Sequence, residues 1–134
     1  MRVGVDIGGM SIKIGLVDDS KKIVAKKVIP TQSDVLPAEG VVANIAEAII
    51  ILLEENNLAV EQCESIGVAC PGTVDGRTGV VLYSNNIRWE NVPMLDILRE
   101  KLPVPMFLAN DADAAALAEV IAGAAKDKEN AVLL

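Results

Sequence analysis

The stretch VGVDIGGMSIKIGLVDD, residues 3–19, places an acid and two glycines between two apolar runs. The second run alternates apolar residues with polar or small ones, which is the two-residue period of a β-strand. The stretch therefore predicts a β-hairpin. An ordinary hairpin turn needs one glycine for a positive φ angle and no acid at all. Asp6, Gly8 and Gly9 therefore need an explanation beyond the turn itself.

The remaining sequence predicts one α/β domain, with a mixed central sheet, three leading antiparallel strands and flanking helices. The expected strands cover residues 1–8, 11–19, 21–31, 64–70 and 105–110, with a hairpin over 73–84 that has Asp75 and Gly76 in its loop; the expected helices cover 38–59, 95–102 and 111–125. The first helix has Val, Ile and Leu on one face and ends at Asn56 and Asn57. Residues 130–134 begin a further strand, so we expect the natural chain to continue.

Composition narrows the classes of function. The chain has 134 residues, 51% of them hydrophobic, and a formal net charge of −7, which disfavours broad binding to nucleic acids or anionic membranes. Asp6 interrupts the N-terminal apolar stretch, so there is no signal-peptide pattern, and the longest apolar run, residues 48–53, is too short to span a membrane. Cys63 and Cys70 occur without any His, as expected for cytoplasmic thiols packed as small hydrophobes.

Two common phosphate motifs do not fit the opening turn. The dinucleotide pattern would need a glycine where Asp6 stands and a helix where a strand follows, and the P-loop would need a Gly-Lys-Ser/Thr sequence. A tight turn without side chains fits better, because the backbone N–H groups of Gly8, Gly9 and Met10 could approach phosphate oxygens. Asp6 could then hold a hydrated Mg²⁺. The turn alone leaves open a simpler reading, a glycine-rich hairpin capped by Asp6.

Three stretches together resemble the ROK (repressor, open reading frame, kinase) family of sugar kinases, which has the actin-like ATPase (ribonuclease H-like) fold. They are DIGGMSIK at residues 6–13, GVACPGTVD at 67–75 and NDADAAALAE at 110–119. The resemblance implies that residues 1–134 are the N-terminal domain of a two-domain kinase about twice as long, whose C-terminal domain is absent from this chain. It also implies nucleotide contacts in the first stretch, at Asp6, Gly8, Gly9, Met10, Ser11 and Lys13. The family commonly has Thr where this chain has Met10, and often Glu where it has Ala109.

The third stretch supplies the acceptor side of the reaction. A sugar kinase needs a carboxylate within reach of the attacking hydroxyl. Asp111 lies where a strand becomes a helix, and the N–H groups of a first helical turn favour its anionic form. By themselves Asn110 and Asp111 are explained more simply as a helix cap, which is compatible with a functional role. The resemblance implies that Asp111 is the general base and that Asn110 and Asp111 contact sugar, while Asp113 is read as structural.

The stretch YSNNIRWENVP, residues 83–93, reads as a loop whose amides suit recognition of several hydroxyl groups. The resemblance points to Asn86 as the sugar-binding residue, with Asn85 as the second choice. It also implies that Gly72 closes over the sugar, and Thr73 adds a candidate hydroxyl contact. Trp89 is expected to pack in the core beneath the loop.

The resemblance implies that the full-length protein phosphorylates a hexose or an N-acylhexosamine with ATP and Mg²⁺, as a glucokinase does. The second phosphate loop, the adenosine pocket and a structural Zn²⁺ site would lie in the absent domain, so the fragment alone is expected to be inactive. We expect a cytoplasmic homodimer that binds neither nucleic acid nor membrane. Two alternatives stay open: a sugar-sensing regulator of the same family, for whose upstream helix-turn-helix there is no room if Met1 is the true start, and an actin-like ATPase without a sugar substrate.

Overall fold

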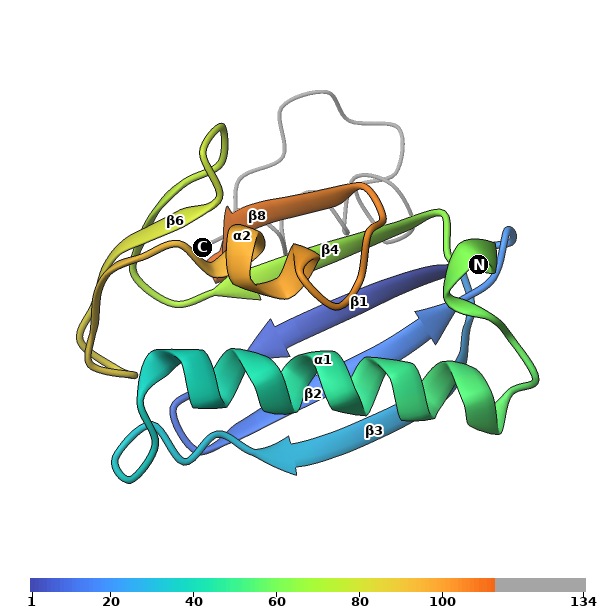
Figure 1. Cartoon of the computed structure of the whole chain (residues 1–134), viewed down its shortest axis with the longest axis horizontal. Coiled ribbons are helices and arrows are strands. Elements are labelled where there is room, and N and C mark those ends of the chain that lie inside the picture. Colours follow the sequence, from blue (N-terminus) through green and yellow to red (C-terminus); the bar gives the residue numbers. More distant parts are fainter. Residues whose placement is uncertain (113–134) are drawn as a thin grey trace.

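The computed structural model describes residues 1–112, which form two β-sheets and a layer of helices (Figure 1). The larger sheet has five strands in the order β3-β2-β1-β4-β8. Their bounds are β1 Arg2–Ile7, β2 Ser11–Val17, β3 Ile23–Pro30, β4 Ser65–Cys70 and β8 Met106–Asn110. Strands β1, β2 and β3 pair antiparallel, whereas β4 is parallel to β1 and β8 is parallel to β4. The predicted mixed sheet with three leading antiparallel strands is confirmed.

The period-two pattern of the opening stretch sets which face of the sheet is buried. Alternate side chains of β1 and β2 point into the core: Val3, Val5 and Ile7 from β1, and Ile12, Ile14 and Leu16 from β2. Each such side chain removed from water contributes roughly 1.5–3 kcal/mol. A shift of one residue in the β1–β2 register would turn this whole set to the other face, so the pattern fixes the pairing.

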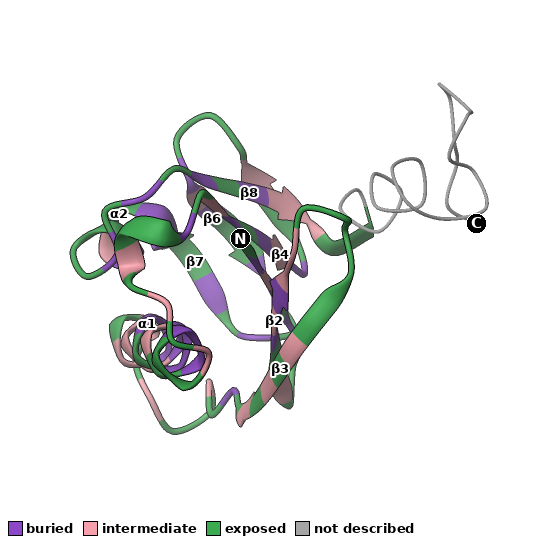
Figure 2. Ribbon diagram, turned by 90° about the vertical axis from the view of Figure 1, so that its right-hand side faces the viewer, coloured by how far each residue is buried: buried purple, intermediate pink, exposed green. Residues whose placement is uncertain are grey.

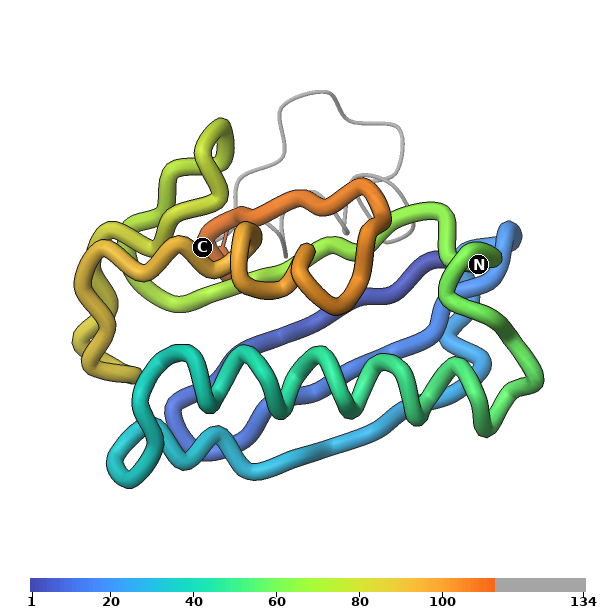
Figure 3. Tube along the Cα trace, in the orientation of Figure 1, coloured from blue at the N-terminus to red at the C-terminus, as the bar shows by residue number. Residues whose placement is uncertain are grey.

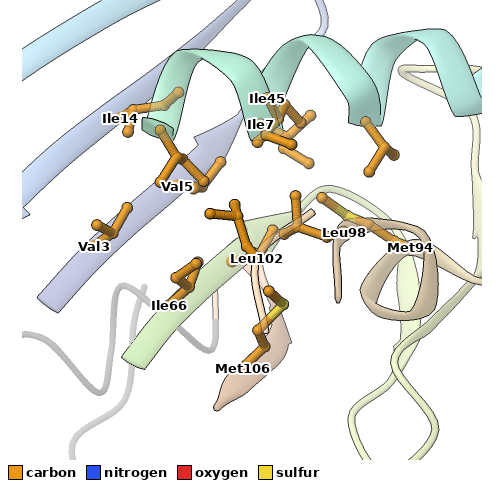
Figure 4. Packing of buried hydrophobic residues seen from close by; sticks show 14 of the residues in the cluster. Val3, Val5, Ile7, Ile14, Ile45, Ile66, Met94, Leu98, Leu102 and Met106 are labelled. Atoms are coloured by element: carbon orange, nitrogen blue, oxygen red, sulfur yellow. The ribbon is translucent and has the colours of Figure 1, made fainter. Parts of the chain in front are cut away.

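Helix α1, Ala38–Glu55, covers the buried face, with the short helix α2, Met94–Arg99, beside it (Figure 1). Figure 4 shows Ile45 of α1 and Leu98 of α2 in the same buried cluster as Val5 and Ile66 of the sheet. As predicted, α1 stops at the Asn pair: its last residue is Glu55 and its C-cap is Asn56, whose Nδ2 donates to the Leu52 carbonyl oxygen at 2.8 Å. A single 3₁₀ turn, η1 Val60–Gln62, leads from there toward β4.

A second, three-stranded antiparallel sheet contains β5 Thr73–Asp75, β6 Val80–Ser84 and β7 Trp89–Val92. The predicted hairpin is present, although Asp75 ends β5 and the residue with positive φ in the loop is Gly79, at 73°. Strand β7 was not expected, because its burial follows no alternation and Asn91 has a φ of 51°. The predicted loop over 83–93 is therefore a turn of residues 85–88 between two strands.

The other face of the larger sheet carries a row of small residues. Figure 2 shows exposed and half-buried positions along the strands of this sheet. Gly15, Gly4 and Gly67 lie opposite one another across β2, β1 and β4, and Phe107 of β8 follows Gly67. An added Cβ at Gly4 or Gly67 would meet no atom within 4 Å, and Phe107 is 65% exposed. A hollow of about 1000 Å³ lies over this row.

Further expectations concern the cysteines, the C-terminal elements, the end of α2 and membrane spans. Cys63 and Cys70 are free and buried, as predicted. The helix expected over 111–125 is described only at Asp111 and Ala112; its remainder, including Asp113, and the strand expected over 130–134 lie outside the described residues. Helix α2 ends at Arg99, earlier than expected. Within residues 1–112, no helix has the length and apolarity needed to cross a membrane.

Candidate functional site

The turn between β1 and β2 closes with one backbone hydrogen bond instead of the usual two. The Gly8 N–H donates to the Ser11 carbonyl oxygen at 2.9 Å. The Gly8 carbonyl oxygen accepts from the Thr31 hydroxyl at 2.8 Å, and the reciprocal bond from the Ser11 N–H is absent from residues 1–112. Within the same residues the N–H groups of Gly9 and Met10 also have no partner. Three consecutive N–H groups are thus left for a ligand.

This geometry corrects one prediction about the turn. Gly8 was expected to offer its N–H to phosphate, but that group is engaged by the Ser11 carbonyl, and the free N–H groups are those of the next three residues. Neither glycine of the turn has a positive φ. Gly8 is required for space, because a Cβ there would lie 2.8 Å from the Ser11 carbonyl oxygen. Met10 projects outward and is 90% exposed.

The turn lies beside the predicted sugar-recognition segment. An added Cβ on Gly9 would be 3.6 Å from the Asn86 carbonyl oxygen. In Figure 3 the blue β1–β2 turn and the yellow segment after β6 lie at the same end of the molecule. Asn85 and Asn86 are exposed, while Ile87 and Trp89 are buried and anchor the segment, so the prediction that Trp89 is a core residue is confirmed.

Asp6 and Lys13 are cross-strand neighbours on the open face of the sheet, both exposed. The carboxylate of Asp6 has no hydrogen bond or ion pair with any residue in the described range. Asp6, Ala69 and Ala109 are aligned across β1, β4 and β8. Both ends of this row line the hollow over the sheet, but that hollow also extends along the glycine row and is broader than the site.

Asn110 joins the end of β8 to the bend after β4. Its Nδ2 donates to the Gly72 carbonyl oxygen at 2.6 Å, and its Oδ1 accepts from the Ala112 N–H at 2.9 Å. Gly72 has a φ of 103°, and a Cβ there would collide with the Tyr83 carbonyl oxygen. Only glycine fits this close approach of β6. The next residue, Thr73, is exposed at the start of β5.

Asp111 follows directly, in the first turn of the helix that begins there. Its Oδ1 accepts from the Ala112 N–H at 2.9 Å, and the same N–H donates to the Oδ1 of Asn110, which caps this helix start. The residue is exposed, and its second carboxylate oxygen has no partner within residues 1–112. Beneath it, burial raises the pKa of the Cys70 thiol to about 12, with a smaller contribution from the Asp111 charge. Cys70 therefore stays a neutral core residue.

The two carboxylates predicted to face one substrate lie at the same edge of the sheet. Asp6 is near the carboxyl end of β1, and Asp111 follows the carboxyl end of β8. Strand β4 separates them, which sets a lateral separation of about 10 Å at the usual strand spacing. The unpartnered N–H groups of the turn begin at Gly9, three residues after Asp6. A phosphate chain can therefore extend from the turn toward Asp111.

Sequence reasoning missed two buried hydroxyl groups near the site. Thr31 is fully buried and bonded to the turn. Ser84 is 1% exposed, and its Oγ has no hydrogen-bond partner among the described residues. Thr31 follows Pro30 at the end of β3, and Ser84 is the last residue of β6. Neither position belongs to a sequence pattern that indicates a function. Their roles depend on contacts between distant segments, so no sequence signal could have identified them.

Comparisons with known proteins agree on one family. The sequence model of the ROK family matches residues 2–134. A glucokinase of Halalkalibacterium halodurans is 34% identical over 98% of this chain and 40% of its own length. The crystal structure of a ROK family glucokinase from Streptomyces griseus in complex with glucose and AMPPNP has a TM-score of 0.80 and 33% identity, and covers 92% of this chain and 37% of that one. The transcriptional regulator NagC of Escherichia coli is 29% identical over 98% of this chain and 32% of its own length. The chain spans about 40% of the length of the glucokinases it matches.

Proposed function

The chain belongs to the ROK family, and on that premise we propose that the full-length protein containing it is an ATP-dependent sugar kinase of the glucokinase type. The fold is the mixed α/β fold of the actin-like ATPases, as in the ROK kinases it resembles. The chain would be the N-terminal domain of a two-domain protein. The similar glucokinases, one of them crystallised with glucose and AMPPNP, support a hexose and ATP as substrates.

One observation carries the proposal. The free N–H groups of the β1–β2 turn and the exposed carboxylate of Asp111 occupy the same edge of the sheet, the backbone of Asn86 lies beside the turn, and Asn85 and Asn86 are exposed. Unpaired backbone N–H groups suit phosphate oxygens. Exposed amides suit sugar hydroxyl groups, because each amide offers donors and an acceptor. A triphosphate and a sugar can thus be held end to end.

The reaction follows from this end-to-end placement of the triphosphate and the sugar. The phosphates of ATP lie against the N–H groups of Gly9, Met10 and Ser11. The sugar lies against Asn86, with the backbone of Gly72 beside it. The sugar hydroxyl oxygen attacks the γ-phosphorus, the bond from that phosphorus to the bridging oxygen breaks, and ADP leaves with the electron pair. Asp111 accepts the hydroxyl proton as the new P–O bond forms.

The residues present also fit a bound Mg²⁺. Magnesium keeps several waters and is usually held by one or two carboxylates together with substrate phosphates. Asp6 offers one exposed carboxylate next to the turn, with no competing partner in residues 1–112. No group of three His, Cys, Asp or Glu gathers among these residues, so waters and phosphates would complete the shell. When bound, Mg²⁺ neutralises phosphate charge. Asp6 would hold it through water.

The similarity to NagC supports a second candidate, a sugar-sensing regulator with the same fold. Both candidates need the sugar side of the site, but only the kinase needs a base opposite the phosphate turn. The exposed carboxylate of Asp111 favours the kinase.

Hexose-dependent consumption of ATP by the full-length protein tests the proposal. Glucose, mannose, N-acetylglucosamine and N-acetylmannosamine would be compared at saturating ATP–Mg²⁺, with ADP release as the measurement. We expect release that requires one of these sugars, and none from the 134-residue chain alone, because the resemblance places the adenosine pocket in the missing domain. Sugar binding without ADP release would support the regulator, and sugar-independent release would support an ATPase of another kind.

A further inference from the structure

We propose that Thr31 is a positioning residue that sets the conformation of the phosphate turn, defined here as residues 8–11. The inference rests on the proposed function in so far as this turn binds the phosphates of ATP. Thr31 follows the last residue of β3 and belongs to none of the three stretches that resemble the family. It would act through the turn and not by touching the substrate.

Two hydrogen bonds join Thr31 to the phosphate turn. The Thr31 hydroxyl donates to the Gly8 carbonyl oxygen at 2.8 Å, and the Thr31 N–H donates to the Met10 carbonyl oxygen at 3.0 Å. The residue is 0% exposed. A buried hydroxyl that lost its partner would incur a desolvation penalty, so this side chain is committed to the Gly8 carbonyl.

The two bonds fix the direction of two peptide groups. All peptide bonds in the described chain are trans, and in a trans peptide the carbonyl and the following N–H point in opposite directions. Since the carbonyls of Gly8 and Met10 point at Thr31, the N–H groups of Gly9 and Ser11 point away from it. Hydrogen bonds in a sheet run across the strands. On the side of β2 opposite β3 lie β1, β4 and β8. Asp6 lies in β1 and Asp111 follows β8, so the N–H groups of Gly9 and Ser11 point toward the side of the sheet that carries both carboxylates.

The hydroxyl also prevents the turn from closing as an ordinary hairpin. In a two-residue hairpin the Ser11 N–H would donate to the Gly8 carbonyl, in return for the bond that the Gly8 N–H gives to the Ser11 carbonyl. Here the Gly8 carbonyl is directed at the Thr31 hydroxyl instead, and the Ser11 N–H makes no hydrogen bond to it. Without the hydroxyl, that carbonyl is free to rotate toward the Ser11 N–H. The phosphate turn would then offer fewer N–H groups to a triphosphate.

Thr31→Val in the full-length protein tests the inference, because valine keeps the shape and removes the hydroxyl. We expect the KM for ATP to rise by about tenfold, because the turn would lose one hydrogen bond from an N–H group to a charged phosphate. The KM for the sugar should change by less than about twofold. Thr31→Ser should restore most of the ATP affinity, since it retains the hydroxyl. Leu53→Ala, which removes a buried side chain from the far end of α1, controls for lowered stability.

Titration calorimetry with ATP–Mg²⁺ separates this inference from the proposed function. A wild-type protein that binds ATP but phosphorylates no sugar would refute the kinase, and weaker ATP binding by Thr31→Val would still support the positioning role. Unchanged ATP affinity in Thr31→Val, equal weakening in Leu53→Ala, or no rescue by serine would overturn it. A folded wild-type protein with no ATP binding would overturn both.

Discussion

At Gly8 an added Cβ would lie 2.8 Å from a backbone oxygen of the same turn, whereas at Gly9 it would lie 3.6 Å from the Asn86 carbonyl oxygen. The first distance is a clash and the second is an ordinary contact. The two glycines of the opening stretch therefore differ. Gly8 permits the turn to close on itself, whereas the space at Gly9 would admit a methyl group beside the turn of residues 85–88.

The two glycines should accordingly differ in their effect on stability. We expect Gly8→Ala to lower the free energy of unfolding by about 1–3 kcal/mol, because the backbone must move to admit the methyl group. Gly9→Ala should change it by less than about 0.5 kcal/mol. Urea denaturation of the 134-residue chain measures both. Equal losses would show that the steric account of Gly8 is mistaken.

Cys70 gives a pH dependence with a definite sign. Burial, and to a lesser degree the Asp111 charge, raises the pKa of this thiol from 9.0 to about 12. The stability that this protonated thiol contributes is complete below the pKa that it has in the unfolded chain. It is lost as the pH rises toward the pKa of the folded protein, because only the unfolded chain then releases the proton.

We therefore expect wild-type stability to fall more steeply above pH 9 than that of Cys70→Ala. Between pH 8 and pH 10.5 the difference between the two losses should reach about 2 kcal/mol. Denaturation curves for both proteins at the two pH values measure it. Comparing losses, not absolute stabilities, removes the direct cost of the substitution. Parallel losses would mean that the native thiol ionises near its ordinary pKa.

At the scale of elements, periodicity predicted most of what the structure shows. Strands β1, β2 and β4 and helix α1 were predictable because each carries a clear two-residue or helical repeat of apolar residues. Strand β7 was not, since its two buried residues are the outer ones, Trp89 and Val92. Its pairing with β6 depends on the 85–88 turn and on core contacts of Ile87, which a local pattern does not encode.

The bend between β4 and β5 offers the sharpest test of how the two sheets are joined. Gly72 combines a φ of 103° with a close approach to Tyr83 and Ser84 of β6. Gly67→Ala is a matched control, because it adds the same methyl group in β4 where nothing lies within 4 Å. We expect Gly72→Ala to lower the free energy of unfolding by about 2–4 kcal/mol and Gly67→Ala by less than about 0.5 kcal/mol. Urea denaturation of both variants decides this, and a tolerated Gly72→Ala would contradict the observed packing of β6.

At the scale of the whole molecule, the placement of the candidate site was predictable and its finer contacts were not. Parallel strands bring their carboxyl ends to one edge of a sheet, so the sequence order alone could place Asp6 and Asp111 together. Three of these contacts join segments far apart in the chain. They are the hydrogen bond from Asn110 to the Gly72 carbonyl, the approach of Asn86 to Gly9 and the hydrogen bond from Thr31 to the Gly8 carbonyl. Such contacts follow only from the packed structure.

The most direct test of the account is the sugar-phosphorylation rate of the full-length protein with Asp111→Asn. Asparagine keeps the Oδ1 that accepts the Ala112 N–H, so the helix start should persist while the proton acceptor is lost. We predict that kcat falls by about a thousandfold, while the affinities for sugar and for ATP–Mg²⁺ stay within a few-fold of wild type. Turnover near the wild-type rate would contradict the central claim that Asp111 takes the proton opposite the phosphate turn.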